Sequence, residues 1–361
     1  MALFPLKRVD ALVAGSIATH IGAVLAVLVG FDVLQALYKE FMDIGDGDYT
    51  ALGAIVHVAY TVPRRIHTLF IIAAVIGTLM GLGMLAGNGE LTGLRAAGLS
   101  KRRIALSATG AVGGLALAVF LMGETLAPEG ERWAQTMAVQ AKHRDYAVSG
   151  IGMWARDGET VMNAKSVLVI DGQLQMRDVR LFRLAPDGRL AGITRAAQAM
   201  HRDGAWQLRG VRRYDLEDGR VVAREAEVET WQSSLDPDVV SQGAIRPHYQ
   251  GMRALWEQYR FLSANQLNTQ AVESAFWQRG FMPLTTLALV FAVTPFAFGA
   301  LRSGGLGKRL FLGIVIAVSF YFLQRALVDM ANAYDYSLPL VNALPVILLA
   351  GAGLWYYRRY A

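Results

Sequence analysis

The chain has 361 residues, of which 54% are apolar and 18% charged, whereas soluble domains average about 45–50% apolar and about 25% charged residues. The net charge of +6 comes from cations at the ends of apolar runs, which argues against a nucleic-acid-binding protein, where cations cluster on one face. The lack of cysteine excludes a disulfide framework, a thiolate metal site and a cysteine nucleophile.

The first third of the chain predicts three membrane-spanning helices. Three apolar segments are close to the length of about 20 residues that a helix needs to cross a bilayer. They run from Ala11 to Leu34, from Ile66 to Ala86 and from Ile104 to Leu126. Lys7 precedes the first segment as in a signal peptide, but the apolar run is too long and no small-x-small cleavage site follows. We therefore expect an uncleaved first helix.

A short amphipathic helix is expected at about residues 88–99, between the second and third segments. Leu91, Leu94 and Ala97 recur at helical spacing, so one face of this helix would be apolar. Glu90 suits the positive end of the helix dipole, and Gly98 suits the helix end. Such a helix either rests on the bilayer as a connector or docks into a groove on a soluble partner. The residues concerned are Glu90, Leu91, Leu94, Arg95, Ala97 and Gly98.

The insert between the third and fourth apolar segments predicts a β-rich domain. Five Asp-Gly dipeptides divide it, and Asp-Gly tolerates the positive φ angles of tight hairpin turns. Short strands at regular spacing suggest a sandwich or jellyroll rather than an α/β fold. Polar, helix-prone connectors flank it at Glu129 to Arg144 and Gln250 to Gln278. The dipeptides are Asp157-Gly158, Asp171-Gly172, Asp187-Gly188, Asp203-Gly204 and Asp218-Gly219.

Three further membrane-spanning helices are expected at Phe281 to Leu301, Leu310 to Val328 and Leu340 to Tyr357. The glycine-rich loop Ser303 to Arg309 between the first two lacks a hydroxyl residue after Lys308, so it is not a nucleotide-binding loop. The predicted organisation is residues 1–130 with three spans, 131–280 with the β-domain, and 281–361 with three spans.

The distribution of cations in the short loops predicts the orientation. Alternate loops are basic, which places both termini in the cytoplasm and the β-domain outside it. Lys39, Arg64 and Arg65 are cations on the outer side and oppose this trend. They either extend to phospholipid head groups or bind the phosphates of an anionic lipid, for which two adjacent arginines are suited. The basic loop residues are Arg95, Lys101, Arg102, Arg103, Arg302, Lys308, Arg309, Arg358 and Arg359.

No catalytic apparatus is evident. The six histidines do not have the spacing of a zinc motif, and there is no Gly-x-Ser-x-Gly elbow. Charged residues near the membrane boundary are expected to face a bundle interior, a cavity or a partner. Arg325 and Asp329 are one helical turn apart and are expected to pair, with either a structural or a gating role. The other two such residues are Asp32 and Glu124.

Motifs along nearly the whole chain are similar to those of the LptF/LptG permease family, the transmembrane subunits of the lipopolysaccharide exporter of Gram-negative bacteria. None of these motifs is a catalytic signature. The matching segments are Leu79 to Ala86, Glu90-Leu91, Ala96 to Gly98, Ala127 to Glu131, Trp154 to Gly158, Pro283-Leu284 and Phe296 to Arg302.

The resemblance implies a non-catalytic permease subunit of the inner membrane with six transmembrane helices and a periplasmic β-jellyroll. Its implied partners are LptF, a dimer of the ATPase LptB, and LptC, and its implied substrate is lipopolysaccharide. No cofactor is implied. The helix at Glu90 to Gly98 would couple to the ATPase. Lys39, Arg64, Arg65 and Arg132 would contact lipid phosphates.

Two other classes of protein remain open from the residues alone. A mechanotransmitting exporter with four helices is disfavoured by the six spans. A membrane-anchored periplasmic sensor or scaffold without transport activity is the second. Co-purification with an ATPase and a second six-helix protein distinguishes a transporter subunit from such a scaffold.

Overall fold

A computed structural model describes most of the chain, and its contacts divide it into two compact units. We call Met1–Ala36, Val62–Ala127 and Phe276–Ala361 the membrane unit. Leu37–Thr61 and Pro128–Ala275 form the β unit, which thus includes a segment that the sequence groups with the first helices. The described residues are 8–45, 47–142, 153–170, 173–187, 189–202, 204–217, 220–233, 247–264, 268–298 and 306–360.

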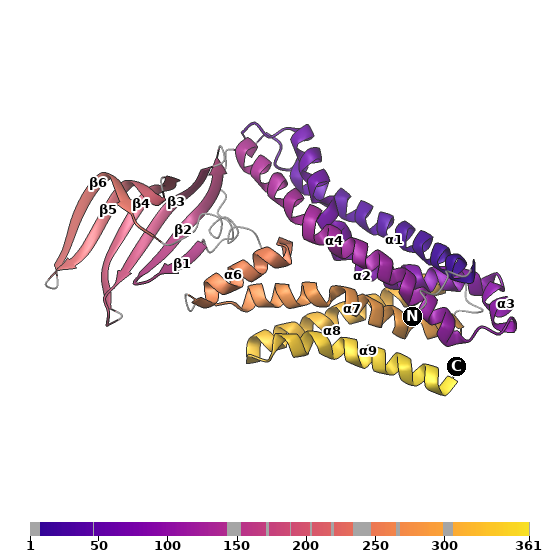
Figure 1. Cartoon of the computed structure of the whole chain (residues 1–361). Helices are drawn as coiled ribbons and strands as arrows, with labels where there is room; N and C mark the ends of the chain where they lie inside the picture. Colours follow the sequence, from indigo (N-terminus) through magenta and orange to yellow (C-terminus); the bar gives the residue numbers. More distant parts are fainter. Residues whose placement is uncertain are drawn as a thin grey trace. The chain divides into compact units, whose positions relative to one another are not determined.

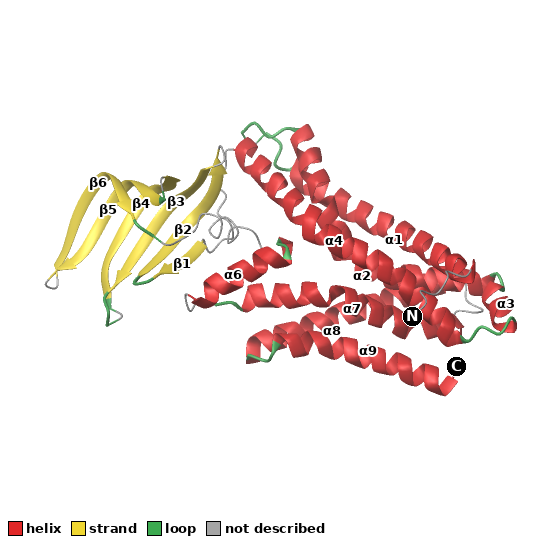
Figure 2. Ribbon diagram, viewed as in Figure 1, coloured by secondary structure: helices red, strands yellow, loops and turns green. Residues whose placement is uncertain are grey.

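The prediction of six membrane-spanning helices is confirmed within the described residues. The helices that qualify by length and composition are α1, α2, α4, α7, α8 and α9, and α3 is a short connector (Figures 1 and 2). All six extend past the predicted apolar segments at one end or both, because the flanking polar residues are also helix-prone. The bounds are α1 Arg8–Phe41, α2 Ala51–Gly87, α3 Glu90–Ala96, α4 Lys101–Lys142, α7 Gln270–Phe298, α8 Leu306–Tyr334 and α9 Leu338–Tyr360.

Helix α2 is the central helix of the membrane unit. Its most apolar window is 72% buried, against 28% for that of α1 and 22% for that of α8. Glycines allow its neighbours to approach closely, as is common between membrane helices. A Cβ atom on Gly77 would lie 2.6 Å from the Cα atom of Ile21 in α1, and one on Gly313 of α8 would lie 3.1 Å from the Cα atom of Ile76. The core of this unit is therefore built around α2.

The β unit contains one antiparallel sheet in which the strands follow their order in the sequence, β1 to β6. Each strand pairs with the next, for example Ala164 with Val179 and Val179 with Ala196, and the register shifts between Arg183 and Leu184 where β3 pairs with β4. Among the described strands this is a meander, without the crossovers of the expected jellyroll. The bounds are β1 Met153–Asp157, β2 Thr160–Ile170, β3 Gln173–Leu184, β4 Leu190–Arg202, β5 Ala205–Glu217 and β6 Arg220–Trp231.

One face of the sheet carries the core of the β unit. Met162, Met176, Trp206 and Leu208 are fully buried there, and Phe261 of helix α6 (Met252–Ala264) packs against them. A short 3-10 helix, η1 (Pro247–Tyr249), precedes α6. The helix-prone connector expected after the β-domain therefore contacts the sheet core through Phe261 before the chain continues into α7.

The Asp-Gly dipeptides separate successive strands, as predicted. Gly158 and Gly204 have φ angles of +58° and +77°, a conformation that suits glycine. Asp171-Gly172, Gly188, Asp203 and Asp218-Gly219 lie outside the described residues, as do Ser303 to Gly305 of the glycine-rich loop.

Candidate functional site

The short helix α3 is closed by backbone geometry at both ends. Gly89 precedes it with a φ angle of +79°, and Gly98 follows it with a φ angle of +88°. The amide of Gly98 donates to the carbonyl of Arg95 at 3.0 Å, and the amide of Leu99 donates to the carbonyl of Leu94 at 3.1 Å. This is a Schellman arrangement, in which glycine ends the helix in the left-handed conformation. The prediction that the helix ends at Gly98 is confirmed.

The apolar face of α3 packs within the chain. Leu91 is only 3% exposed and belongs to the core of the membrane unit, against which Leu94 and Leu99 also pack. The sequence left open whether Leu91 and Leu94 face the bilayer or a soluble partner, and in the structure both pack against the core of the membrane unit. The exposed surface of α3 is small and consists of Thr92, Gly93, Arg95 and Ala96, with the exposed Ala97 directly after it.

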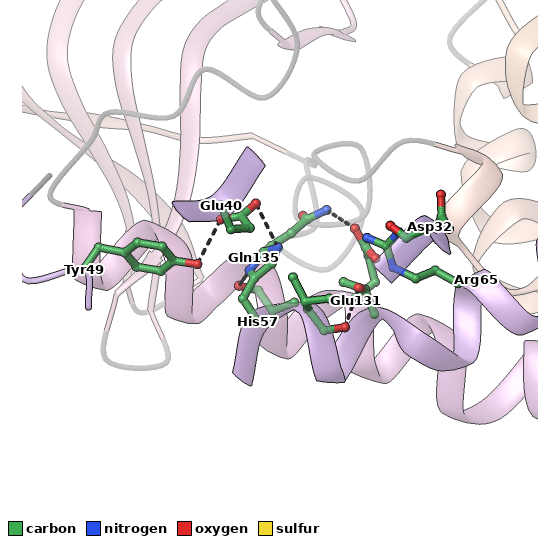
Figure 3. Close-up of polar contacts among 10 residues, drawn as sticks. Asp32, Glu40, Tyr49, His57, Arg65, Glu131 and Gln135 are labelled. Atoms are coloured by element: carbon green, nitrogen blue, oxygen red, sulfur yellow. Dashed lines mark hydrogen bonds and ion pairs between the residues drawn. The ribbon is translucent and has the colours of Figure 1, made fainter. Parts of the chain in front are cut away.

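Arg65 and Arg132, both expected to bind lipid phosphates, have acidic partners. The guanidinium of Arg65 pairs with Asp32 of α1 within the membrane unit, and the side chain of Arg65 is only 11% exposed (Figure 3). Arg132 of the β unit lies 3.3 Å from Glu129 on an exposed helix surface. Lys39 is exposed in the last turn of α1, and Arg64 is half-buried in α2.

A polar network in the β unit joins the end of α1, the start of α2 and the last part of α4, and sequence reasoning missed it. The hydroxyl of Tyr49 donates to Glu40 at 2.9 Å, and Nε2 of His57 lies 3.6 Å from the other Glu40 oxygen (Figure 3). Nδ1 of His57 lies 2.9 Å from the carbonyl oxygen of Ala134 in α4. These residues have no shared motif, so only the fold identifies the network.

A second network lies inside the membrane unit, around Glu124 of α4. Arg279 of α7 pairs with the Glu124 carboxylate and donates to the carbonyl of Gly123, and its side chain is only 7% exposed. The ring of His67 in α2 packs against Gly123, where a Cβ atom would lie 2.2 Å from it. The sequence marks Glu124 as an unusual membrane charge, but it does not identify Arg279 as its partner.

The remaining charged pair predicted from the sequence is present. Arg325 and Asp329 form an ion pair of 3.8 Å on an exposed face of α8. Across the described residues, no group of three His, Cys, Asp or Glu side chains is arranged to hold a metal ion. The Arg65–Asp32 and Arg279–Glu124 pairs of the membrane unit thus connect helices, whereas Arg325–Asp329 lies within α8.

Comparison with known proteins identifies the family of this chain. The profile of the family described as "Lipopolysaccharide export system permease LptF/LptG" matches residues 12–359. The chain is 28% identical to the lipopolysaccharide export system permease protein LptG of Escherichia coli K12 over 98% of its own length and 99% of that protein. It is 26% identical to LptG of Haemophilus influenzae over 98% of its length and 99% of that protein. The chain therefore belongs to the LptF/LptG family of lipopolysaccharide export permeases.

Proposed function

We propose that this chain is the LptG-type permease subunit of a lipopolysaccharide ABC exporter. It pairs with LptF to line a cavity, and an LptB dimer supplies ATP hydrolysis from the cytoplasm. LptC associates through its membrane helix, and lipopolysaccharide passes from the inner membrane to the periplasmic bridge. The main support is the family match across residues 12–359, together with six helices of membrane-spanning length.

The decisive experiment is reconstitution. The purified complex in lipid vesicles should release lipopolysaccharide to an acceptor protein when ATP is added, and should not do so with a non-hydrolysable analogue. The chain should also co-purify with an ATPase and a second six-helix protein. A chain that purifies without an ATPase, in vesicles that release no lipid, would instead support a membrane-anchored sensor or scaffold.

The proposed orientation places both termini and α3 in the cytoplasm and the β unit in the periplasm. Lys101 at the start of α4 donates to the carbonyl of Tyr360 at 2.9 Å, so the basic end of α9 and the α3–α4 turn share one end of the membrane unit. Because the chain lacks cysteine, single cysteines report exposure without background. Arg189→Cys should react with an impermeant maleimide in intact spheroplasts, and Arg95→Cys only after permeabilisation. The reverse labelling would contradict this orientation.

The ATPase contact is proposed on the exposed face of α3, with Thr92, Arg95 and Ala96 at its centre. A substitution at Leu91 or Leu94 would disturb the core, so it does not test this contact. Ala96→Trp adds bulk to the exposed face and should strongly reduce co-purification of the ATPase while the permease still folds. Ala333→Trp, at the exposed opposite end of α8, is the control and should leave co-purification unchanged. Equal co-purification with both variants would exclude the α3 contact.

Lys39, Arg64 and Arg132 are proposed as contacts for lipid phosphate. Arg65 is a weaker candidate because it already pairs with Asp32. Lys39→Glu and Arg132→Glu should each reduce the lipopolysaccharide that co-purifies with the complex. Arg358→Glu makes the same charge reversal at the cytoplasmic end and should not. Unchanged lipid in the first two variants would leave these cations with a role at phospholipid head groups.

A further inference from the structure

The first turn of α4 carries three consecutive cations, Lys101, Arg102 and Arg103. Cations are disfavoured at the positive end of a helix dipole unless a polar partner or the solvent offsets the repulsion. Lys101 donates to the carbonyl of Tyr360, at the negative end of α9. The side chain of Arg102 is exposed, whereas that of Arg103 is directed toward α1.

Arg103, Asp10 and Ser107 form a closed hydrogen-bonded set, which we call the α1–α4 clasp. Nη2 of Arg103 donates to Oδ2 of Asp10 at 2.7 Å, and Nη1 donates to Oγ of Ser107 at 2.9 Å. The Ser107 hydroxyl donates to the second oxygen of Asp10. The Asp10 side chain is only 13% exposed, and both of its oxygens accept hydrogen bonds. One bond comes from the charged guanidinium of Arg103 and the other from the Ser107 hydroxyl. The clasp fixes the first turn of α1 to the first turns of α4.

The clasp is also connected to α3 through very few residues. Gly98 and Leu99 close the end of α3, and Ser100 then caps α4 by accepting the amide of Arg103 at 3.2 Å. Leu94 and Leu99 pack on the apolar cluster that contains Val13 of α1 and Ile104 of α4. A displacement of α3 must therefore move the first turn of α4, which carries Arg103.

Helix α1 is suited to respond as a lever. Its backbone closely approaches Gly77 and Gly81 of α2 at Ile21 and Ile17. With a rise of about 1.5 Å per residue, Asp10 lies about 14 Å from the middle of that contact and Ala36 lies about 25 Å beyond it. If α1 pivots at the glycine contact, a shift at Asp10 becomes about twice as large at Ala36.

We infer that the α1–α4 clasp is a positioning element that transmits displacement of α3 to α1, and so links the ATPase cycle to movement of the first spanning helix. This inference rests on the proposed function for its biological meaning, because α3 is assumed there to receive the ATPase motion. The clasp itself stands on contacts within the membrane unit.

The functional test measures lipopolysaccharide released per ATP hydrolysed by the full complex in vesicles. Arg103→Gln and Ser107→Ala should lower this ratio about fivefold or more, the lower range of couplings between sites, while subunit assembly and ATP hydrolysis persist. Arg102→Gln is the matched control, since it removes an exposed cation from the same turn, and it should keep the wild-type ratio. The double variant Asp10→Asn, Arg103→Gln should be no worse than Arg103→Gln alone, as expected for one shared interaction. Equal ratios for Arg103→Gln and Arg102→Gln would overturn the inference.

A structural test does not depend on transport. Spin labels at Thr92→Cys on α3 and Leu12→Cys on α1, both exposed in a cysteine-free chain, report the distance between these helices. The distance distribution should be narrow in the wild-type and Arg102→Gln backgrounds and broad with Arg103→Gln or Ser107→Ala. Equal widths in all backgrounds would refute the clasp. A wild-type complex that releases no lipid would instead refute the proposed function, and the label distances would still decide the role of the clasp.

Discussion

Gly77→Ala tests whether the membrane unit depends on close packing of α1 against α2. The added Cβ atom would lie 2.6 Å from both Cα and N of Ile21, and these backbone atoms cannot move without the whole helix. Favourable carbon contacts lie at about 3.5–4.0 Å. The two helices must therefore separate by about 1 Å at this level.

The cost has two sources and one offset. Inserting a methyl group into a packed contact costs about 1–3 kcal/mol. Separation would also stretch the 3.1 Å hydrogen bond from Ser16 Oγ to the carbonyl of Gly81, which is worth about 0.5–1.5 kcal/mol. Alanine is favoured over glycine in a helix by up to about 1 kcal/mol, which opposes both. The net expectation is destabilisation by about 1–3 kcal/mol.

Gly22→Ala is the matched control, because it makes the same substitution next to Ile21 but meets no atom within 4 Å. Thermal unfolding of the purified chain in detergent should show a lower midpoint for Gly77→Ala than for the wild type. The midpoint of Gly22→Ala should equal or exceed that of the wild type. If Gly77→Ala were as stable as Gly22→Ala, the close contact would have no energetic role and the reasoning would be refuted.

Two further predictions concern the polar networks. Glu124→Leu leaves the buried guanidinium of Arg279 without its carboxylate and should lower the free energy of unfolding by about 3–5 kcal/mol. The double variant Glu124→Leu, Arg279→Leu should recover most of that loss in the same thermal melts. A double variant as unstable as the single one would contradict an isolated ion pair. Glu40→Ala removes the hydrogen-bond acceptor of Tyr49 and the ionic partner of His57. Limited proteolysis of the segment between α1 and α2 should therefore be faster in this variant than in the control Met42→Ala, which changes an exposed side chain. Equal cleavage rates would argue against the network.

Local patterns in the sequence predict the elements of this fold. Apolar length identifies the spanning helices, and Asp-Gly dipeptides mark the hairpins, because both signals depend on neighbouring residues. The end of α3 at Gly98 is likewise a local signal, because glycine adopts the positive φ angle that ends the helix. The pairing of Arg325 with Asp329 is also local, since the two side chains share one helix face.

Contacts between distant segments could not be predicted in this way. Arg279 lies 155 residues from Glu124, and Asp10 lies 93 residues from Arg103. A single sequence gives these residues the same appearance as ordinary cations and carboxylates near a membrane boundary. The packing of Leu91 and Leu94 on the core could not be predicted either, because helical spacing is the same whether the chain, the bilayer or a partner covers an apolar face.

The positions of the ion pairs suggest how such a bundle can move without losing its core. On α1, Asp10 and Asp32 each lie 11 residues from Ile21, one toward each end, and each pairs with an arginine of another helix. The middle of α1 packs on glycines and has little freedom to slide, because any separation costs contacts along the whole interface. An ion pair at a helix end can instead open and re-form with other partners, including lipid phosphates or water. Movement of this helix should therefore be controlled at its charged ends and pivot at its glycine-packed centre.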